Sequence, residues 1–392
     1  MSKIFNIFLI AVVAVVIIEA GFILKDKNAG AKSLSAYAGE MIQKCAKQSW
    51  KPGCYDKEIP KLMDRISMED AFKVTKLIQQ EDTDTNYFYC HVLGHNLSAK
   101  ETAKDPSKWK EVITRCPSGM CSNGCIHGAF QERFRSESLP DSEIDKLLPE
   151  LKTICEPKPK WNPTGMEKAT CYHALGHLMM YITDADIKKS NSICDKAAPE
   201  YLRVCYDGNF MQIYQPLEPE DFALVKKFDM DTREKAAEFC GQFTGQQLGS
   251  CWRESWPLSR EELRTPKGLV KFCNYFKDKT EKEICYNAEF YVLAAQFGFD
   301  IDKIKNLCSE LPGDVKGQCF ANSASRLIET DYGLISKSVD LCKTAAQFGV
   351  QAACYDELLK YSTFNFQPGS EGALKTCNSL IEPWKTKCLS KN

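Results

Sequence analysis

The chain has 392 residues and a formal net charge of −1, with 51 Lys and Arg against 52 Asp and Glu, and it contains 20 Cys. Because charges of both signs are interspersed and nearly balanced, electrostatics gives no basis for binding nucleic acid. So many cysteines would be a liability in a reducing cytosol, whereas outside the cytoplasm they form stable disulfides. We therefore expect an extracytoplasmic protein, periplasmic or at the cell surface, long enough for two domains or one extended array.

Residues 1–28 are predicted to form an N-terminal membrane anchor. The segment from Ile4 to Leu24 is almost entirely apolar, and it is long enough for one helical crossing of a bilayer. A cleaved signal peptide has a shorter apolar core and small residues at its cleavage site, and the sequence around Ala20 fits that pattern poorly. We therefore favour an uncleaved transmembrane signal-anchor that holds the protein at the membrane, with cleavage as the alternative.

Closely spaced pairs of cysteines mark a repeat along the rest of the chain. The second members of the last five pairs, from Cys251 to Cys388, follow one another at intervals of 34 or 35 residues. A period near 34 residues is that of a two-helix unit in helical solenoids. Apolar residues at helical spacing precede the first cysteine of a pair, as in Ile301–Cys308, and strand-like alternation is scarce. The pattern predicts an all-α solenoid of about ten helical hairpins over residues 33–392.

In period and cysteine placement, these units resemble the Sel1-like and tetratricopeptide (TPR) classes of helical-hairpin repeat, particularly their secreted, disulfide-stapled members. The resemblance covers most of the chain after the anchor and implies an α-solenoid. We divide the array into residues 33–215, which carry all the histidines, and residues 216–392. The second part is a plainer array, which we expect to suit contacts with a protein partner.

Each pair of cysteines is expected to form a disulfide that ties the end of one helix to the start of the next. Cys90 and Cys121 fall outside this scheme, and we predict a disulfide between them that links neighbouring repeats beside the histidines. Alternatives are an exchange of roles between Cys116 and Cys121, or a pair of free thiolates that bind a metal. The nine hairpin pairs are Cys45–Cys54, Cys116–Cys125, Cys155–Cys171, Cys194–Cys205, Cys240–Cys251, Cys273–Cys285, Cys308–Cys319, Cys342–Cys354 and Cys377–Cys388.

All five histidines of the chain lie within residues 91–177. Four of them form two copies of the motif His-x-x-Gly-His, and the fifth lies in the sequence Cys-Ile-His-Gly. Histidines four residues apart project from one face of a helix, which is a common arrangement of metal ligands. Equivalent positions in successive repeats line up along one face of a solenoid. The sequence therefore predicts a metal site formed by His91, His95, His127, His173 and His177.

The three motifs allow more than one arrangement of metal. One ion can lie between the helix of the first pair and His127, and another between His127 and the second pair. In a tightly curved array, both pairs can share one centre. Imidazole ligands favour zinc, copper, nickel or iron over calcium or magnesium. Additional candidate ligands or neighbours of the metal are Gln131, Glu132, Asp207, Tyr89 and Tyr172.

Two other interpretations compete with metal binding. Gly94 and Gly176 precede the second histidine of each pair, and they predict close approach by a neighbouring helix or by a flat cofactor such as haem. Haem would be bound non-covalently, because the chain has no Cys-x-x-Cys-His. In the second interpretation, the histidines serve packing in a metal-free scaffold for a protein, peptide or envelope component. The chain lacks His-Glu-x-x-His, a Gly-rich phosphate loop and a serine nucleophile elbow, so the sequence assigns no enzymatic reaction.

Overall fold

The computed structural model describes residues 32–391, apart from 86–89, 135–137, 160 and 217–218. In this part of the chain every regular element is a helix, and the β pairing is an isolated bridge between Lys158 and Trp161. The all-α prediction is therefore confirmed. The α-helices are α2 (Leu34–Cys45), α3 (Lys51–Glu58), α4 (Met68–Glu81), α5 (His91–Lys104), α6 (Trp109–Thr114), α7 (Gly124–Phe134), α8 (Asp141–Leu151), α9 (Gly165–Ile182), α10 (Ile187–Ala197), α11 (Leu202–Tyr214), α12 (Pro219–Val225), α13 (Arg233–Cys240), α14 (Gly245–Glu254), α15 (Arg260–Leu263), α16 (Pro266–Cys273), α17 (Lys279–Gln296), α18 (Ile301–Ser309), α19 (Gly313–Thr330), α20 (Ile335–Ala345), α21 (Gln351–Asn365), α22 (Glu371–Ser379) and α23 (Trp384–Leu389).

All twenty cysteines lie in the described residues, and all are paired in ten disulfides. The nine predicted hairpin pairs are confirmed, and so is the disulfide between Cys90 and Cys121. The exchanged pairing and the pair of free thiolates are therefore wrong. Ten disulfides are typical of a protein from an oxidising compartment outside the cytoplasm.

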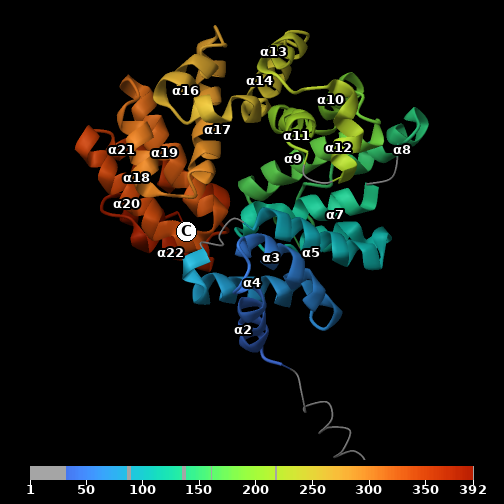
Figure 1. Ribbon diagram of the computed structural model, residues 1–392, viewed down its shortest axis with the longest axis horizontal. Coiled ribbons are helices and arrows are strands. Elements are labelled where there is room, and N and C mark those ends of the chain that lie inside the picture. The colour runs from blue at the N-terminus through green and yellow to red at the C-terminus, as the bar shows by residue number, and fades with distance from the viewer. Residues whose placement is uncertain (1–31, 86–89, 135–137, 160, 217–218, 392) are drawn as a thin grey trace, which may run out of the picture.

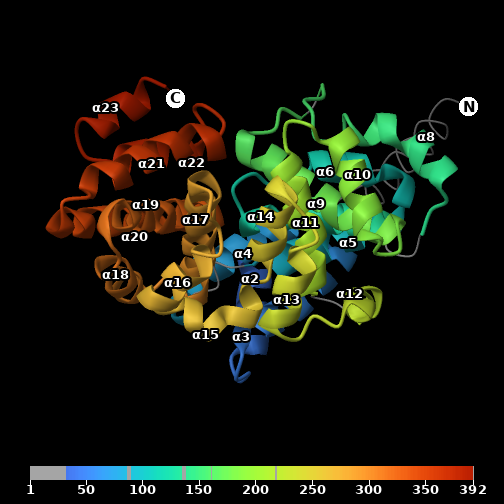
Figure 2. The same cartoon turned by 90° about the horizontal axis from the view of Figure 1, so that it is seen from above.

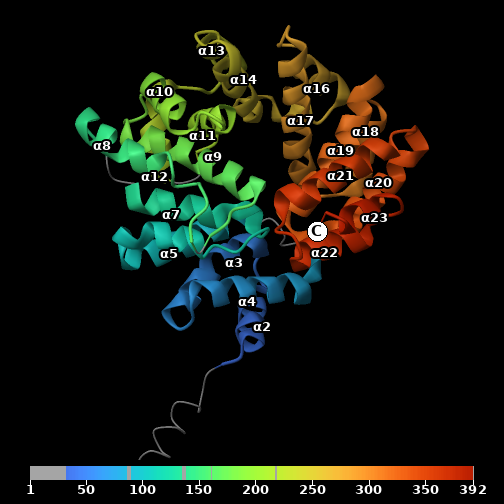
Figure 3. The ribbon, with the colours of Figure 1, turned by 180° about the vertical axis from the view of Figure 1, so that it is seen from behind.

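The second helices of successive hairpins pack against one another in chain order, from α5 through α7, α9, α11, α14, α17 and α19 to α21. The first helices of these hairpins lie beside them, as expected for an α-solenoid. The array curves until its two ends meet, so that α22 lies beside α4 (Figures 1 and 3). Lys76 on α4 contacts the Tyr332 hydroxyl and lies 3.8 Å from the Glu371 carboxylate on α22. Helix α21 also contacts α9, and the view from above shows the two halves side by side (Figure 2).

The hydrophobic core is divided between two clusters of buried side chains. The first extends from Tyr37 to Cys251, and the second extends from Trp252 to Cys388. The two clusters therefore meet within α14, at one junction of the curved array. The division of the array at residue 216 stays a prediction.

The predicted membrane anchor, residues 1–28, lies outside the described residues. Within the described part of the chain, none of the helices has both the length and the apolar character that a membrane crossing requires. The first described helix, α2, begins after Ser33, whose hydroxyl accepts a hydrogen bond from the backbone N–H of Ala36. This cap satisfies one of the free donors at the helix start.

Candidate metal centre

Helices α5, α7 and α9 bring the five histidines into one continuous row. His91 is the first residue of α5, and His95 lies one turn later. His127 lies at the fourth position of α7. Its ring lies 5.0 Å from that of His91 and 5.4 Å from that of His173 on α9, measured between ring centroids. The predicted meeting of the three motifs is therefore present in the structure.

The second cysteine of each pair is expected to open the second helix of its hairpin, which would place Cys171 and His173 in the first turns of α9, but α9 begins earlier. Thr164 and Glu167 form a capping box, in which each side chain accepts a hydrogen bond from the other residue's backbone N–H. Such a box stabilises a helix start. Helix α9 therefore begins at Gly165, and its first histidine, His173, lies in the third turn.

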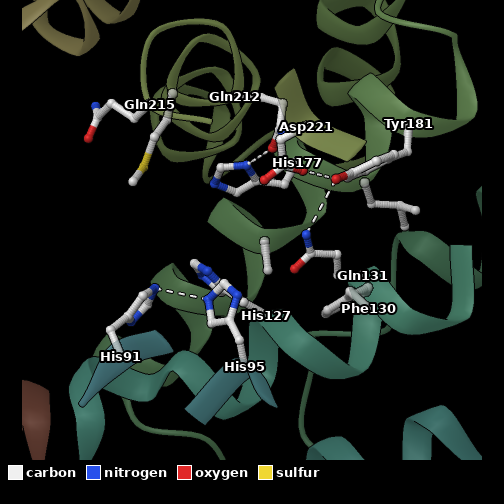
Figure 4. Close-up of a pocket in the computed structure, with 13 residues that line it drawn as sticks. His91, His95, His127, Phe130, Gln131, His177, Tyr181, Gln212, Gln215 and Asp221 are labelled. Atoms are coloured by element: carbon white, nitrogen blue, oxygen red, sulfur yellow. Dashed lines mark hydrogen bonds between the residues drawn. The ribbon is translucent and has the colours of Figure 1, made fainter. Parts of the chain in front are cut away.

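His91, His95 and His127 are close enough to hold one metal ion. The Nε2 atoms of His91 and His95 are 3.1 Å apart. One ligand nitrogen from each of the three residues can be chosen so that all three lie within 4.8 Å of one another. Two nitrogens on a tetrahedral zinc ion, with bonds of about 2.0–2.1 Å, lie roughly 3.3 Å apart. The first pair already has this spacing, and the ring of His127 lies beside both of its members, 5.0 Å from His91 and 5.1 Å from His95 (Figure 4).

A hydrogen bond from the other side of the ring orients His91. Its Nδ1 lies 3.3 Å from the carbonyl oxygen of Ser122, so Nδ1–H donates and Nε2 is left as the unprotonated nitrogen. Contacts of this kind are common behind metal-binding imidazoles, because they fix the tautomer and the ring orientation. The Nε2 lone pair of His91 consequently faces His95 and the centre of the cluster.

The segment that supplies this carbonyl has an unusual backbone. Cys121, Ser122 and Asn123 have φ angles of 52°, 47° and 55°, in the left-handed region that costs an L-residue about 1–2 kcal/mol. Disulfides at Cys121 and at Cys125 hold both ends of the segment. The covalent links therefore maintain a strained turn whose carbonyl orients His91, and strain of this kind clusters at functional sites.

His127 has a buried nitrogen without a hydrogen-bond partner. Its side chain is only 7% exposed, and no described residue is within hydrogen-bonding reach of its Nε2. An unsatisfied buried polar atom costs about 1–3 kcal/mol. A metal ion shared with His91 and His95 would remove that cost, because the lone pair of the nitrogen would then form a bond.

Glycines allow the helices of the row to approach closely. A Cβ built on Gly94 would lie 2.8 Å from the backbone nitrogen of Cys125 on α7, and one on Gly176 would lie 2.1 Å from the carbonyl oxygen of Cys205 on α11. A side chain cannot occupy either position without moving the backbone. The close neighbour predicted at both glycines is therefore a helix. The glycines give no support to the haem interpretation.

The second histidine pair has its own set of contacts. The Nε2 atoms of His173 and His177 are 3.2 Å apart. His177 donates from Nδ1 to Oε1 of Gln212 at 2.6 Å, and Nε2 of His173 lies 3.3 Å from Sδ of Met211. Both partners lie on α11. The second pair therefore forms a cluster next to the first, and the ring of His127 lies 5.4 Å from that of His173 and 5.6 Å from that of His177.

Burial lowers the pKa of four of the five histidines, which favours their neutral form. Loss of hydration lowers the pKa of His91 to about 4, and Arg326 contributes a smaller effect in the same direction. Desolvation, followed by the neighbouring imidazoles, also lowers the pKa of His127 and His173 well below the ordinary value. The pKa of His177 is lowered by desolvation against an opposing hydrogen bond to Gln212. Neutral imidazole is the form that binds metal.

The additional side chains considered from the sequence mostly have other partners. Gln131 lines a small cavity of about 30 Å³ beside the first cluster and donates to the Tyr181 hydroxyl at 3.3 Å. Asp207 accepts from Arg253 at 2.8 Å, and the Tyr172 hydroxyl donates to Glu156 at 2.7 Å. Both are therefore engaged in contacts outside the histidine row. Glu132 does not line either cavity beside the histidines, and Tyr89 lies outside the described residues.

A larger cavity of about 680 Å³ adjoins the histidine row from inside the curved array. One wall carries His91, His127 and His173 together with Met211 from α11, and the opposite wall comes from α14, α17 and α19. Because the two ends of the array meet, both histidine clusters border the same cavity. A small molecule or a hydrated ion can reach them from this cavity.

Three contacts of the site were absent from the sequence prediction: the Ser122 carbonyl, Met211 and Gln212. Every residue has a backbone carbonyl, so the residue type at position 122 could not indicate this contact. Met211 could have been found from spacing, because Gly208 and Met211 repeat the three-residue separation of Gly124 and His127. That equivalence is evident only when the contacts of the two glycines are known.

No family model, curated protein or solved structure matches the chain. The similarity to Sel1-like and tetratricopeptide repeats is therefore one of repeat period and cysteine placement. Evidence about function comes from the arrangement of side chains in the histidine row.

Proposed function

We propose that this protein is an extracytoplasmic, membrane-anchored α-solenoid that binds a divalent transition metal through His91, His95 and His127. The observation that carries the proposal is the buried, unpartnered Nε2 of His127 beside two histidines with metal-ligand spacing. The orienting hydrogen bond from His91 to Ser122 supports it, as does the lowered pKa of His91 and His127, which favours the neutral form that binds metal.

The ligand set indicates the class of metal. Three imidazole nitrogens suit zinc, copper, nickel or iron, whereas calcium and magnesium prefer oxygen ligands. Three protein ligands leave at least one further coordination position on a tetrahedral ion, as in catalytic rather than structural zinc sites. His91 and His127 both line the large cavity, so a water molecule or small ligand can approach that position.

Zinc content tests this proposal. The full-length chain is purified in detergent with its disulfides intact and without an affinity tag of histidines, equilibrated with zinc, and analysed for bound metal. We expect about one zinc ion in the wild type and a loss of zinc in the double variant His95→Ala/His127→Ala. His173→Ala/His177→Ala is the matched control, because it removes the same number of imidazoles from the same row and leaves the first cluster intact.

Two results would contradict the proposal. One is a wild-type protein that binds no zinc, copper, nickel or iron, and the other is unchanged occupancy in His95→Ala/His127→Ala. Either would favour the metal-free scaffold, in which the histidines only pack between helices. Circular dichroism and a count of free thiols establish that each variant has retained its helices and its disulfides.

A further inference from the structure

Two helix crossings in the histidine row have the same geometry. Where α5 crosses α7, a Cβ on Gly124 would lie 2.2 Å from the carbonyl oxygen of His91. Where α9 crosses α11, a Cβ on Gly208 would lie 2.1 Å from the carbonyl oxygen of His173. In each case a glycine on the later helix contacts the backbone of the first histidine in a His-x-x-Gly-His motif. The two pairs of helices are therefore structurally equivalent.

This equivalence gives Met211 a defined place. His127 lies three residues after Gly124 on α7, and Met211 lies three residues after Gly208 on α11. Residues three apart lie on neighbouring parts of one helix face. Met211 therefore occupies, in the second crossing, the position that His127 occupies in the first. Its sulfur lies 3.3 Å from Nε2 of His173, as expected for a third ligand at that position.

We propose that His173, His177 and Met211 form a second metal site, which selects monovalent copper. The two Nε2 atoms are 3.2 Å apart, and the hydrogen bond to Gln212 leaves Nε2 of His177 as the unprotonated nitrogen. Its residues are distinct from those of the first cluster, so the second site extends the proposed function without depending on it.

The chemistry of the three ligands selects the ion. A thioether is a soft ligand that suits Cu(I), whereas zinc favours imidazole, thiolate and carboxylate. All three ligands are neutral, so the buried complex carries the charge of the ion alone. Burying a single positive charge without an anionic ligand costs less than burying two. His173 and Met211 both line the large cavity, which provides a path for the ion.

Competition for Cu(I) tests the second site. The full-length chain carries His95→Ala/His127→Ala, so that the first cluster does not contribute, and ascorbate keeps the copper monovalent. Affinity is measured against the chromophoric chelator bathocuproine disulfonate. We expect binding of about one Cu(I) in this background, and at least a tenfold weaker affinity after Met211→Leu, which removes the sulfur at similar volume. Met166→Leu is the matched control, because Met166 lines the same cavity two turns before His173 on α9.

The outcomes separate this proposal from the first. A sulfur contribution in the copper X-ray absorption spectrum that disappears in Met211→Leu supports the site, as does zinc binding gained by Met211→His, which recreates the three-histidine cluster. Equal Cu(I) affinity of Met211→Leu and its parent would overturn it, as would the absence of Cu(I) binding in the parent. Zinc binding at the first cluster is measured in His173→Ala/His177→Ala, so either site can fail while the other holds.

Discussion

The backbone of Gly124 lies directly against the carbonyl group of His91, so closely that a Cβ at Gly124 would be 2.2 Å from the oxygen. The contact brings α5 and α7 near enough for an imidazole on one helix to reach two on the other. Real Cβ atoms do not approach an oxygen so closely, and glycine is therefore required at the crossing. Gly176 has the same role between α9 and α11, where its Cβ would meet the Cys205 oxygen at 2.1 Å.

Gly176→Ala should destabilise the protein, because the added methyl group forces α9 and α11 apart. We expect the free energy of unfolding to fall by about 1–3 kcal/mol, and Cu(I) affinity to fall with it. Gly39→Ala is the matched control, since a Cβ on Gly39 in α2 would meet nothing within 4 Å. That substitution should stabilise the protein by about 0.5–1 kcal/mol. Urea unfolding of the oxidised protein measures both, and equal effects would show that the crossing at Gly176 tolerates a side chain.

Removal of the Cys90–Cys121 disulfide should weaken zinc binding. The disulfide holds the residue before His91 to the strained turn that contains Ser122. With both cysteines changed to Ala, we expect the turn to relax and zinc affinity to drop about tenfold or more, as when outer contacts of a metal ligand are lost.

The hairpin disulfide Cys308–Cys319 provides the comparison for that experiment. Its double Ala variant should also lose stability, by about 2–4 kcal/mol, but should keep its zinc affinity, because α18 and α19 supply no ligand to the first cluster. Equal zinc affinity of the two double variants would contradict a role for the Cys90–Cys121 link in positioning His91.

Gln212 should increase the affinity for Cu(I) by orienting the ring of His177. Its Oε1 accepts from Nδ1 of His177 at 2.6 Å, and loss of such a contact lowers metal affinity by about 10–100-fold. We expect this loss for Gln212→Leu in the chelator competition. Gln212→Glu retains an acceptor oxygen at the same position and should retain the affinity. A similar loss in both variants would indicate that Gln212 contributes packing rather than orientation.

Stability should depend on pH through Glu289 on α17. Desolvation raises the pKa of this buried carboxyl well above its ordinary value, although Arg253 acts in the opposite direction. Above about pH 4.5 the unfolded chain releases this proton while the folded protein retains it. The contribution of the protonated Glu289 to the free energy of unfolding is therefore complete below that pH. It is lost as the pH rises towards the folded-state pKa.

Glu289→Gln removes this proton linkage. Between about pH 5 and 8, the variant should gain about 1 kcal/mol or more in free energy of unfolding relative to the wild type. Glu283→Gln, at a partly exposed position of the same helix, is the control and should show no such trend. Parallel pH profiles for the wild type and Glu289→Gln would mean that Glu289 ionises freely in the folded protein.

Much of the fold was predictable because it depends on residues near one another in the chain. The hairpin cysteines are separated by 9 to 16 residues, so their pairing holds for any curvature of the array. Cys90 and Cys121 were paired by elimination and by their place beside the histidines. The cysteine pattern places the start of α9 near Cys171. The helix begins instead at Gly165, because the capping box at Thr164 stabilises a helix start at that point.

The sequence by itself determined the all-helical class, most of the hairpin disulfides and the gathering of five histidines on successive helices, since period and spacing encode all three. Only the tertiary structure decided that Cys121 pairs with Cys90 and that His127 lies against the histidines of α5. It also decided that Met211 and Gln212 face the pair on α9, and that both clusters open to one cavity. These outcomes depend on the distance between crossing helices and on the closure of the array. Both arise from packing among residues far apart in the chain, which no local pattern records.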